Sequence, residues 1–377
     1  MASMSRSRRW LILTSVVVFV VLVVPRWTAG VGAGAYFDGE LAAQDALAQT
    51  VVKGVMEQEG PTAYQTGFVR FDGQSTIAIH QMALLGLGQI VLDHPEKREA
   101  YLPAMRAAAD HLADPSVLVY ADQVYAAEGD RAYDEGRAYL GYTNLGLGML
   151  RMIDPDGPHA PLHDRITADL TRRIAASKHG MIETYPGETW PPDVAAVVGS
   201  IGLHARATKT DRSELLARWA ETFERCALHG KTGLLFQRMT SGSCEAVDAP
   251  RGSGTAIASY FLSFATPVLA RRLYDALVAE LWVDVLGFGG VREYASGFTG
   301  EGDVNAGPIL FGVSVGATGF AIAATRTHGD RARFRGLYRS TSLFGVPTSV
   351  DGRTAFAAGG VLGNALLLAM LTARPLR

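Results

Sequence analysis

The feature that most constrains the fold of this 377-residue chain is a regular alternation of two kinds of helical segment. Beyond residue 40, apolar residues recur at helical spacing, and no long alternating run of β-branched residues appears. Segments rich in glycine, alanine and aliphatic residues predict helices that are buried on all sides: 76–92, 137–153, 193–207, 253–264, 304–325 and 361–372. We therefore expect an all-α protein with an inner set of helices.

Amphipathic segments with arginine-bearing faces separate these inner segments and predict a half-solvated outer layer: 41–56, 100–113, 162–177, 213–228, 268–281 and 332–342. Six inner and six outer helices in alternation predict an (α/α)6 toroid, which the helix at 41–56 closes by packing beside the last inner helix. An irregular α-helical domain is the alternative. With 48% hydrophobic residues, residues 36–377 are expected to form a single catalytic domain around a large core.

The loops of this predicted toroid differ in length at its two ends. Connections from inner to outer helices are short, as at 94–98, 209–212 and 266–267. Connections from outer to inner helices are long and would all emerge above the N-termini of the inner helices: 114–136, 178–192, 229–252, 282–303 and 344–360. Long loops in a compact domain usually carry function, so this end is expected to be the active-site mouth.

The N-terminal segment has the pattern of an export signal. Arg6, Arg8 and Arg9 precede an uncharged stretch at 10–24 that Pro25 and the residues after it close. About fifteen apolar residues fit a signal-peptide core and fall short of the roughly 20 of most transmembrane helices. Cleavage after Ala35 and retention as an uncleaved anchor both fit, and the paired arginines also resemble a twin-arginine signal. The domain is expected in the periplasm, or on the periplasmic face of the inner membrane.

Charge and cysteine content exclude several classes. With 35 basic and 37 acidic residues the net charge is −2, so no global field attracts nucleic acid, and no nucleic-acid partner is expected. The two cysteines, Cys226 and Cys244, are too few for a disulfide scaffold or a four-thiolate zinc site. They could pair once or remain free thiols.

The predicted mouth is rich in carboxyl groups, most densely in GMIETYPGETWPPDV at 180–194. A carboxyl in an apolar, partly dry cavity can stay protonated near neutral pH and act as an acid. On this basis the candidate catalytic residues are Glu183, Asp193, Glu188 and Asp303; Glu293 lies on the same loops. The alternatives are that Asp193 only offsets helix N-terminal amides and that Glu188 is a solvated loop residue.

Further acidic and aromatic residues of the expected mouth are candidates for binding substrate: Asp72, Asp122, Tyr142, Tyr185, Trp190, Glu245, Asp248, Tyr260 and Tyr294. Neither an HExxH pair nor a P-loop is present, so neither a metal nor another cofactor is expected. The GxSxG string formed by Gly312, Ser314 and Gly316 lies in an apolar run that we interpret as helix, which favours close helix packing over a nucleophile elbow. The aspartate-rich and DxDD motifs of terpene synthases and cyclases are also absent.

Three strings are similar to bacterial linalool dehydratase-isomerase: GYTNLGLGML at 141–150, GMIETYP at 180–186 and GGVREYASG at 289–297. The resemblance is distant and spans about 75–340. It implies an exported (α/α)6 enzyme of monoterpene alcohols. By position, the family's active-site histidine corresponds to Tyr142, its first cysteine to Glu183, and its second lies beside Pro192 and Asp193. None of these residue types is retained, which puts the family's own substrate in doubt.

The resemblance implies a metal-independent lyase, isomerase or cyclase that acts on an apolar isoprenoid. A carboxylic acid would protonate the substrate, and Trp190, Tyr185, Tyr142 and Tyr260 would stabilise the cation. It also implies a homo-oligomer that completes its site from a neighbouring subunit. One alternative is a glycoside hydrolase or polysaccharide lyase of the same fold with paired carboxyls. Another is a non-catalytic toroid that binds a lipid or an envelope partner.

Overall fold

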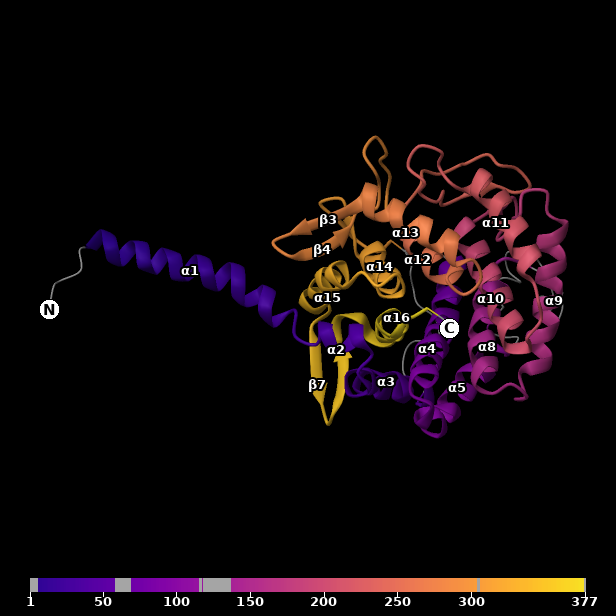
Figure 1. The fold of residues 1–377 in the computed structure, drawn as a ribbon, viewed down its shortest axis with the longest axis horizontal. Helices are drawn as coiled ribbons and strands as arrows, with labels where there is room; N and C mark the ends of the chain where they lie inside the picture. Colours follow the sequence, from indigo (N-terminus) through magenta and orange to yellow (C-terminus); the bar gives the residue numbers. More distant parts are fainter. Residues whose placement is uncertain (1–5, 58–68, 115–116, 118–136, 304–305, 376–377) are drawn as a thin grey trace.

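The computed structural model describes residues 6–57, 69–114, 117, 137–303 and 306–375. Within these residues the inner helices are α4 (Val69–Asp93), α8 (Leu140–Ile153), α10 (Pro191–Thr208), α12 (Gly252–Leu262), α14 (Val315–Thr327) and α16 (Gly360–Thr372). Each packs on the next in this order, and α16 packs on α4, so the ring closes. The predicted (α/α)6 toroid is confirmed (Figure 1).

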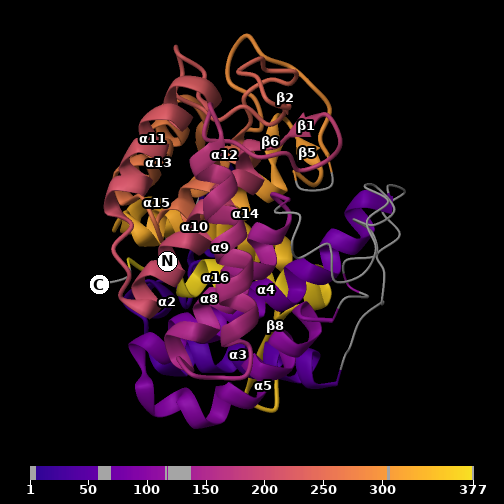
Figure 2. The same cartoon turned by 90° about the vertical axis from the view of Figure 1, so that its right-hand side faces the viewer.

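The outer layer contains α3 (Leu41–Met56), α5 (Arg98–Leu112), α9 (Ala160–Ala176), α11 (Ser213–Ala227), α13 (Pro267–Leu281) and α15 (Arg331–Gly345). Each outer helix packs on at least one inner helix, and Figure 2 shows them around the ring. Short 3-10 turns, η1 (Pro95–Lys97) and η3 (Ala357–Gly359), precede α5 and α16. The predicted outer segments match these helices because their apolar stripes face the inner ring and their arginines face water.

Glycine sets how closely the inner helices approach one another. A Cβ atom on Gly141 of α8 would lie 2.6 Å from the backbone nitrogen of Val197 on α10. A Cβ atom on Gly199 of α10 would lie 2.4 Å from the carbonyl oxygen of Phe261 on α12. Both distances are below van der Waals contact, so only glycine permits these helices to touch backbone to backbone.

Four two-stranded antiparallel sheets lie on the toroid within the described residues, and the last three pair neighbouring strands as hairpins. They pair β1 (Glu188–Thr189) with β2 (Met239–Thr240), β3 (Trp282–Val285) with β4 (Phe288–Val291), β5 (Ile309–Leu310) with β6 (Val313–Ser314), and β7 (Pro347–Val350) with β8 (Arg353–Phe356). The expectation of a helix over 304–325 is therefore wrong at its start. Helix α14 begins at Val315 because the residues before it pair as a hairpin whose turn, Phe311–Gly312, has positive φ at both positions.

The same correction applies to the GxSxG string, of which only Gly316 lies in a helix. Ser314 ends β6 and caps α14, since its hydroxyl accepts a hydrogen bond from the Ala317 amide and donates one to the Ala306 carbonyl. Gly312 occupies the hairpin turn. Ser314 therefore acts as a helix cap.

The cysteines left open by the sequence form a disulfide between Cys226, at the end of α11, and Cys244, in the loop after β2. This bond attaches the long loop between α11 and α12 to the outer layer.

An apolar helix at the N-terminus, α1 (Arg6–Thr28), projects from the body (Figure 1). Two described stretches are long and apolar enough to cross a membrane. One, Gly73–Asp93, is 83% buried and is core helix α4, whereas the other, Leu13–Asp38, is only 6% buried. It includes α2 (Ala33–Asp38), where Ala33 and Tyr36 are buried and Tyr36 packs on Tyr338 of α15. A signal sequence and a membrane anchor both have the composition of this N-terminal stretch.

Candidate functional site

A cavity of about 1000 Å³ opens where the inner helices begin. The N-terminal part of every inner helix contributes to its lining: Ser75 of α4, Tyr142 of α8, Asp193 of α10, Ser253 of α12, Gly316 of α14 and Gly363 of α16. The cavity lies at the end of the ring where the sequence predicted the active-site mouth, and its catalytic role stays a prediction. The size is at the upper end of the range for small-molecule sites, roughly 300–1,000 Å³.

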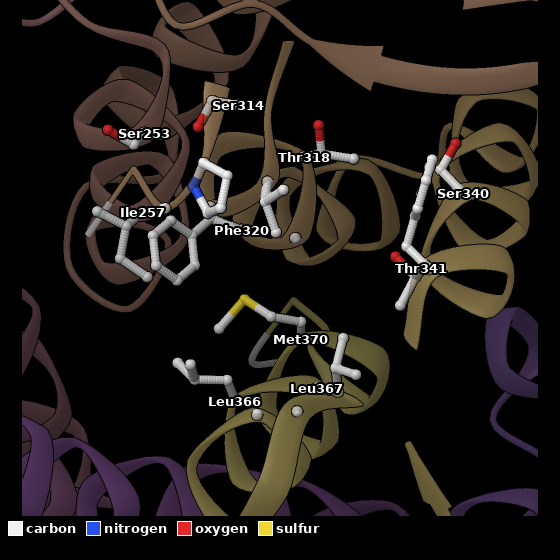
Figure 3. A pocket seen from close by; sticks show the side chains of 18 of the residues that line it. Ser253, Ile257, Ser314, Thr318, Phe320, Ser340, Thr341, Leu366, Leu367 and Met370 are labelled. Carbon is white, nitrogen blue, oxygen red and sulfur yellow. The ribbon is translucent and has the colours of Figure 1, made fainter. Parts of the chain in front are cut away.

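The cavity has two walls of different chemistry. We call the first the polar wall, which comprises Gln81, Tyr142, Asp193, Gln237 and Ser253. We call the second the apolar wall, which comprises Phe288, Val313, Phe320, Leu366, Leu367 and Met370. In Figure 3 the α16 side chains lie across the cavity from the α14 and α12 side chains, with Ser253 and Ser314 at the upper edge. Because α8 and α10 lie opposite α14 and α16 in the ring, Tyr142 and Asp193 of the polar wall lie on the other side of the ring from Phe320 and Leu366 of the apolar wall.

Asp193 is the titratable group on the polar wall. Pro191 and Pro192 begin α10 without amide hydrogens to satisfy, and Asp193 follows them, 5% exposed. The Tyr142 hydroxyl donates to its Oδ1 at 2.5 Å, and the Thr184 side chain also hydrogen-bonds to it.

The pKa of Asp193 is raised to about 6, chiefly by burial and also by the negative charge of Asp303, whereas its two hydrogen bonds oppose the shift. A carboxyl with this pKa is partly protonated near neutral pH and can donate a proton to a bound molecule.

Asp303 belongs to a charged cluster beside the cavity that is centred on Arg251. The Arg251 guanidinium donates to Asp303 Oδ2 at 2.8 Å and to Asp248 Oδ2 at 2.6 Å, and it lies 5.6 Å from the centre of the Tyr294 ring. Burial opposes the charge of Arg251, but the two carboxylates raise its pKa above the ordinary value. Three predicted residues thus meet around an arginine that the sequence did not single out.

Glu293 is the second group that sequence reasoning did not select. It is fully buried at the end of β4, and the Ser253 hydroxyl donates to its Oε1 at 2.6 Å. Burial raises its pKa, while hydrogen bonds from Ser253 and Ser314 act in the other direction. Both serines line the cavity, so Glu293 lies directly behind its wall. The sequence signal for Glu293 was its position on a mouth loop. Its burial arises only from tertiary packing and could not be read from the sequence.

Glu183 and Glu188 lie beside Asp193 in sequence but do not line the described cavity. Glu183 pairs with Arg137 at 3.1 Å and accepts the Gly187 amide at 2.7 Å, which closes the turn before β1. Glu188 accepts from Arg238 at 3.0 Å and from the Trp190 ring nitrogen at 3.1 Å. These contacts give the two carboxyls a role in shaping the loop, and their catalytic role stays a prediction.

The predicted aromatic residues divide in the same way. Tyr142 and Trp190 line the cavity, whereas Tyr185 is buried with its ring 6.3 Å from that of Trp190. Tyr260 is fully buried in the core, where its hydroxyl donates to Gln89, and burial raises its pKa above the ordinary value. Tyr294 donates to the Glu301 carbonyl. The structure thus brings Tyr142 and Trp190 to the site and packs Tyr260 away from it.

The remaining candidates lie elsewhere. Glu245 is exposed to solvent in the loop after β2. Asp72 is part of α4, but its side chain lies outside the described residues, and so does the whole of Asp122.

Two groups of metal-ligating residues occur in the described part of the chain, both apart from the cavity lining. One comprises His179 and the two disulfide-bonded cysteines, whose sulfurs are thus unavailable as thiolate ligands. The other comprises His163, Asp164 and His204, where His204 and Arg151 already bind the Asp164 carboxylate. The candidate site therefore rests on carboxyl, hydroxyl and amide groups.

The protein is an (α/α)6 toroid with a buried carboxyl at its mouth. Solved structures of other proteins show the same fold. No protein-family model and no curated protein sequence matches the chain. An α-1,6-mannanase of Salegentibacter sp. HEL1_6, solved as an inactive variant with α-1,6-mannotetrose, is similar over 86% of this chain and 97% of its own, with 11% identity and a TM-score of 0.52.

Two other structures give comparable matches. An unsaturated glucuronyl hydrolase of Bacillus sp. GL1, responsible for the degradation of glycosaminoglycan, covers 88% of this chain and 96% of its own, with 14% identity and a TM-score of 0.56. A family 105 glycoside hydrolase of C. acetobutylicum ATCC 824 covers 86% and 98%, with 10% identity and a TM-score of 0.52. All three proteins act on carbohydrates by their names.

These matches overturn the resemblance to linalool dehydratase-isomerase, and with it the isoprenoid lyase, isomerase or cyclase function and the apolar isoprenoid partner. The physical reason is that the shared strings are rich in residues that the fold requires. Gly141 and Gly148 of GYTNLGLGML permit close helix packing, and Gly289 and Gly290 of GGVREYASG pack under Trp282 and Val313. Such strings report helix and hairpin packing and carry no information on the substrate.

Proposed function

We propose that this protein is an exported enzyme that cleaves glycosidic linkages, with Asp193 as the proton donor. The observation that carries the proposal is a buried carboxyl with a pKa of about 6 on the wall of a large cavity at the mouth of the toroid. The carbohydrate-acting proteins with this fold supply the substrate class. Their low sequence identity leaves the sugar and the linkage as matters for experiment.

The chemistry follows from the protonation state of Asp193. A protonated Asp193 would donate its proton to the oxygen of the scissile linkage, and the sugar ring would acquire positive charge as the bond between that oxygen and the sugar carbon breaks. Water would then add to the sugar carbon and lose a proton, which returns Asp193 to its protonated form. Asp303 is the second carboxyl of the proposal, because its negative charge is felt at Asp193 and would stabilise that positive charge. Tyr142 holds Asp193 in place through its hydroxyl, and Gln81 and Gln237 offer amides to sugar hydroxyls.

The exported location is part of the proposal. The exposed apolar helix α1 begins with Arg6, Arg8 and Arg9, and the Cys226–Cys244 disulfide suits an oxidising compartment. Cleavage after Ala35 would remove Ala33, which is buried against the body. This packing favours α1 as a retained anchor.

The experiment uses the full-length chain purified in detergent. The protein is incubated with α-1,6-linked mannooligosaccharides, unsaturated glucuronyl oligosaccharides and alkyl glycosides, and products are followed by mass spectrometry. We expect Asp193→Asn to lower kcat/KM by about 10³-fold, in the range for loss of a general acid. Glu183→Gln is the matched control, since it makes the same carboxyl-to-amide change outside the cavity lining, and it should stay within tenfold of wild type.

Two outcomes would contradict the proposal. Equal turnover by Asp193→Asn and wild type would show that Asp193 is not the proton donor. An absence of turnover on the whole panel by folded wild-type protein would favour the non-catalytic toroid.

A further inference from the structure

The apolar wall of the cavity continues to the protein surface. Val285 and Leu286 at the β3–β4 turn, and Leu343 and Phe344 at the end of α15, line the cavity and are also exposed to solvent. We call these four residues the apolar rim. Helix α15 runs beside β4, where Ser340 donates to the Gly289 carbonyl at 2.6 Å, so the two parts of the rim belong to one packed unit.

The turn that contains Leu286 holds this residue in a backbone conformation that leucine disfavours. Leu286 and Gly287 form the two-residue loop between Val285 and Phe288, and both have positive φ, 55° and 83°. This turn usually takes asparagine, aspartate or glycine first, because other side chains strain the left-handed conformation. The β7–β8 turn has that ordinary sequence, Asp351–Gly352, with the same sign of φ.

The β5–β6 turn repeats the apolar pattern, since Phe311 has a φ of 51° and its side chain is fully exposed. Both apolar turns line the cavity, whereas the Asp351 turn does not. Strain and exposure of large apolar side chains at the cavity edge have no explanation in folding and point to a binding role.

The rim lies beside the end of helix α1. A Cβ atom on Gly287 would lie 2.7 Å from the Arg26 Nε, and Arg339 of α15 donates to the Gly287 carbonyl at 3.1 Å. Figure 1 shows the β3–β4 turn on the side of the body from which α1 projects. Arg26 and exposed Trp27 end the apolar stretch with residue types that favour a membrane interface. A bilayer that contains α1 would therefore meet the apolar rim.

We propose that the apolar rim rests on the membrane that holds α1, and that the cavity takes the apolar chain of a glycolipid drawn from that membrane. This inference rests on the proposed function, since it places the sugar of the glycolipid at Asp193. The polar wall then faces the sugar, and the apolar wall, with Phe320, Leu366 and Met370, faces the chain. The substrate class is thus an amphiphilic glycoside with an acyl or alkyl chain.

The first test measures membrane contact without any catalysis. Full-length protein carrying one nitroxide label, at Leu286→Cys or Phe344→Cys, is placed in vesicles of phosphatidylcholine and phosphatidylglycerol at three to one. Power-saturation spectroscopy then compares access of oxygen with access of a water-soluble nickel complex. We expect at least a fivefold lower nickel access at these sites than at Asp351→Cys, which labels the matched turn outside the cavity. Equal nickel access at all three sites would overturn the membrane contact.

The second test measures cavity occupancy. Full-length protein in phosphatidylcholine nanodiscs doped with a monoglucosyl diacylglycerol is examined by native mass spectrometry. We expect one retained glycolipid per chain, with at least a fivefold loss in Gly319→Trp or Gly363→Trp. Both glycines line the cavity, and an added Cβ meets nothing within 4 Å at either position. The control, Ala332→Trp on the exposed start of α15, should retain the lipid.

The outcomes separate this inference from the proposed function. Retention of phosphatidylcholine in place of the glycolipid, or equal retention by the cavity variants, would overturn the glycolipid site. If the protein cleaves soluble glycans but neither contacts the membrane nor retains the glycolipid, the glycolipid inference is overturned and the proposed function stands. If the protein binds the glycolipid and contacts the membrane but cleaves no glycoside, the glycolipid site is supported and the proposed enzymatic function is wrong.

Discussion

The two halves of the inner ring use glycine for opposite purposes. In the half formed by α8, α10 and α12, Gly141 and Gly199 let backbones touch, and a Cβ atom at either would overlap the next helix. The other half is formed by α14, α16 and α4. Gly86 of α4 packs on Leu368 of α16 in this half, but Gly319 and Gly363 face the cavity, where a Cβ atom would meet nothing within 4 Å. We call the first the closed half, because its glycines bring neighbouring helices into contact. We call the second the open half, because Gly319 and Gly363 leave space in the cavity.

This difference corresponds to the two walls of the cavity. Asp193 lies on the closed half, where rigid packing holds it against Tyr142, which donates from α8. The apolar wall lies mainly on the open half, where half-buried Leu366, Leu367 and Phe320 leave space for a ligand. A reacting group needs a fixed position, whereas an apolar chain needs only a dry surface of suitable volume.

The largest expected effect concerns stability on the closed half. Burial raises the Asp193 pKa from its ordinary 3.8 to about 6, so the folded protein binds a proton more tightly than the unfolded chain. The free energy of unfolding should therefore fall as pH rises from about 4 to about 6, by about 3 kcal/mol in total. Asp193→Asn should recover up to that amount at pH 8 and nothing near pH 3.5.

Thermal denaturation of both proteins at the two pH values checks this prediction. Stabilisation that is the same at pH 3.5 and pH 8, or a loss at pH 8, would show that ionisation of Asp193 is not costly in the folded state.

The second prediction compares the two halves directly. Gly199→Ala should lower the free energy of unfolding by about 2 to 3 kcal/mol, because its Cβ would overlap the Phe261 carbonyl. Gly319→Ala should raise it by about 0.5 to 1 kcal/mol, because a helical alanine in open space restricts the unfolded chain. Chemical denaturation of the two variants tests the contrast, and equal destabilisation would mean that the open half is as closely packed as the other.

The third prediction is the pH dependence of activity. A proton donor with a pKa of about 6 requires kcat/KM to fall about tenfold per pH unit above that value. Asp303→Asn should move this fall to lower pH, since a negative charge that raises the Asp193 pKa is removed, while Arg251 keeps Asp248 as its second carboxylate partner. The measurement is kcat/KM from pH 4.5 to 8.5 for both proteins. If kcat/KM falls at the same pH in the variant as in the wild type, the charge of Asp303 does not raise the pKa of Asp193.

The smallest effect is expected at Glu183. Its pair with Arg137 is partly exposed, so Glu183→Gln should cost no more than about 1 kcal/mol of stability after solvent screening. Thermal denaturation of the variant and of the wild-type protein at pH 8 measures this change. A loss of several kcal/mol would show that the turn it closes supports the whole mouth.

The sequence specified the helices well because their signals are local. Apolar spacing predicted the outer helix at 41–56, and the inner helix at 361–372 differs by one residue from α16. The error at 304–325 arose because an apolar run has no helical signature of its own, and Phe311–Gly312 is not a turn that composition would suggest. Family-like strings misled for a related reason, since packing glycines recur in any protein of this fold.

The sequence by itself determined the order of helices, the end of the ring that bears the long loops, and the stock of carboxyls on them. Only the tertiary structure decided which carboxyl is chemically unusual. Glu183 lies in the loop before α10 and Asp193 in the first turn of that helix, yet the first reaches Arg137 and water, and the second reaches Tyr142, 51 residues away, in a buried cavity wall. A pKa depends on the surroundings of the charge, and those surroundings come from helices that meet only when the ring closes.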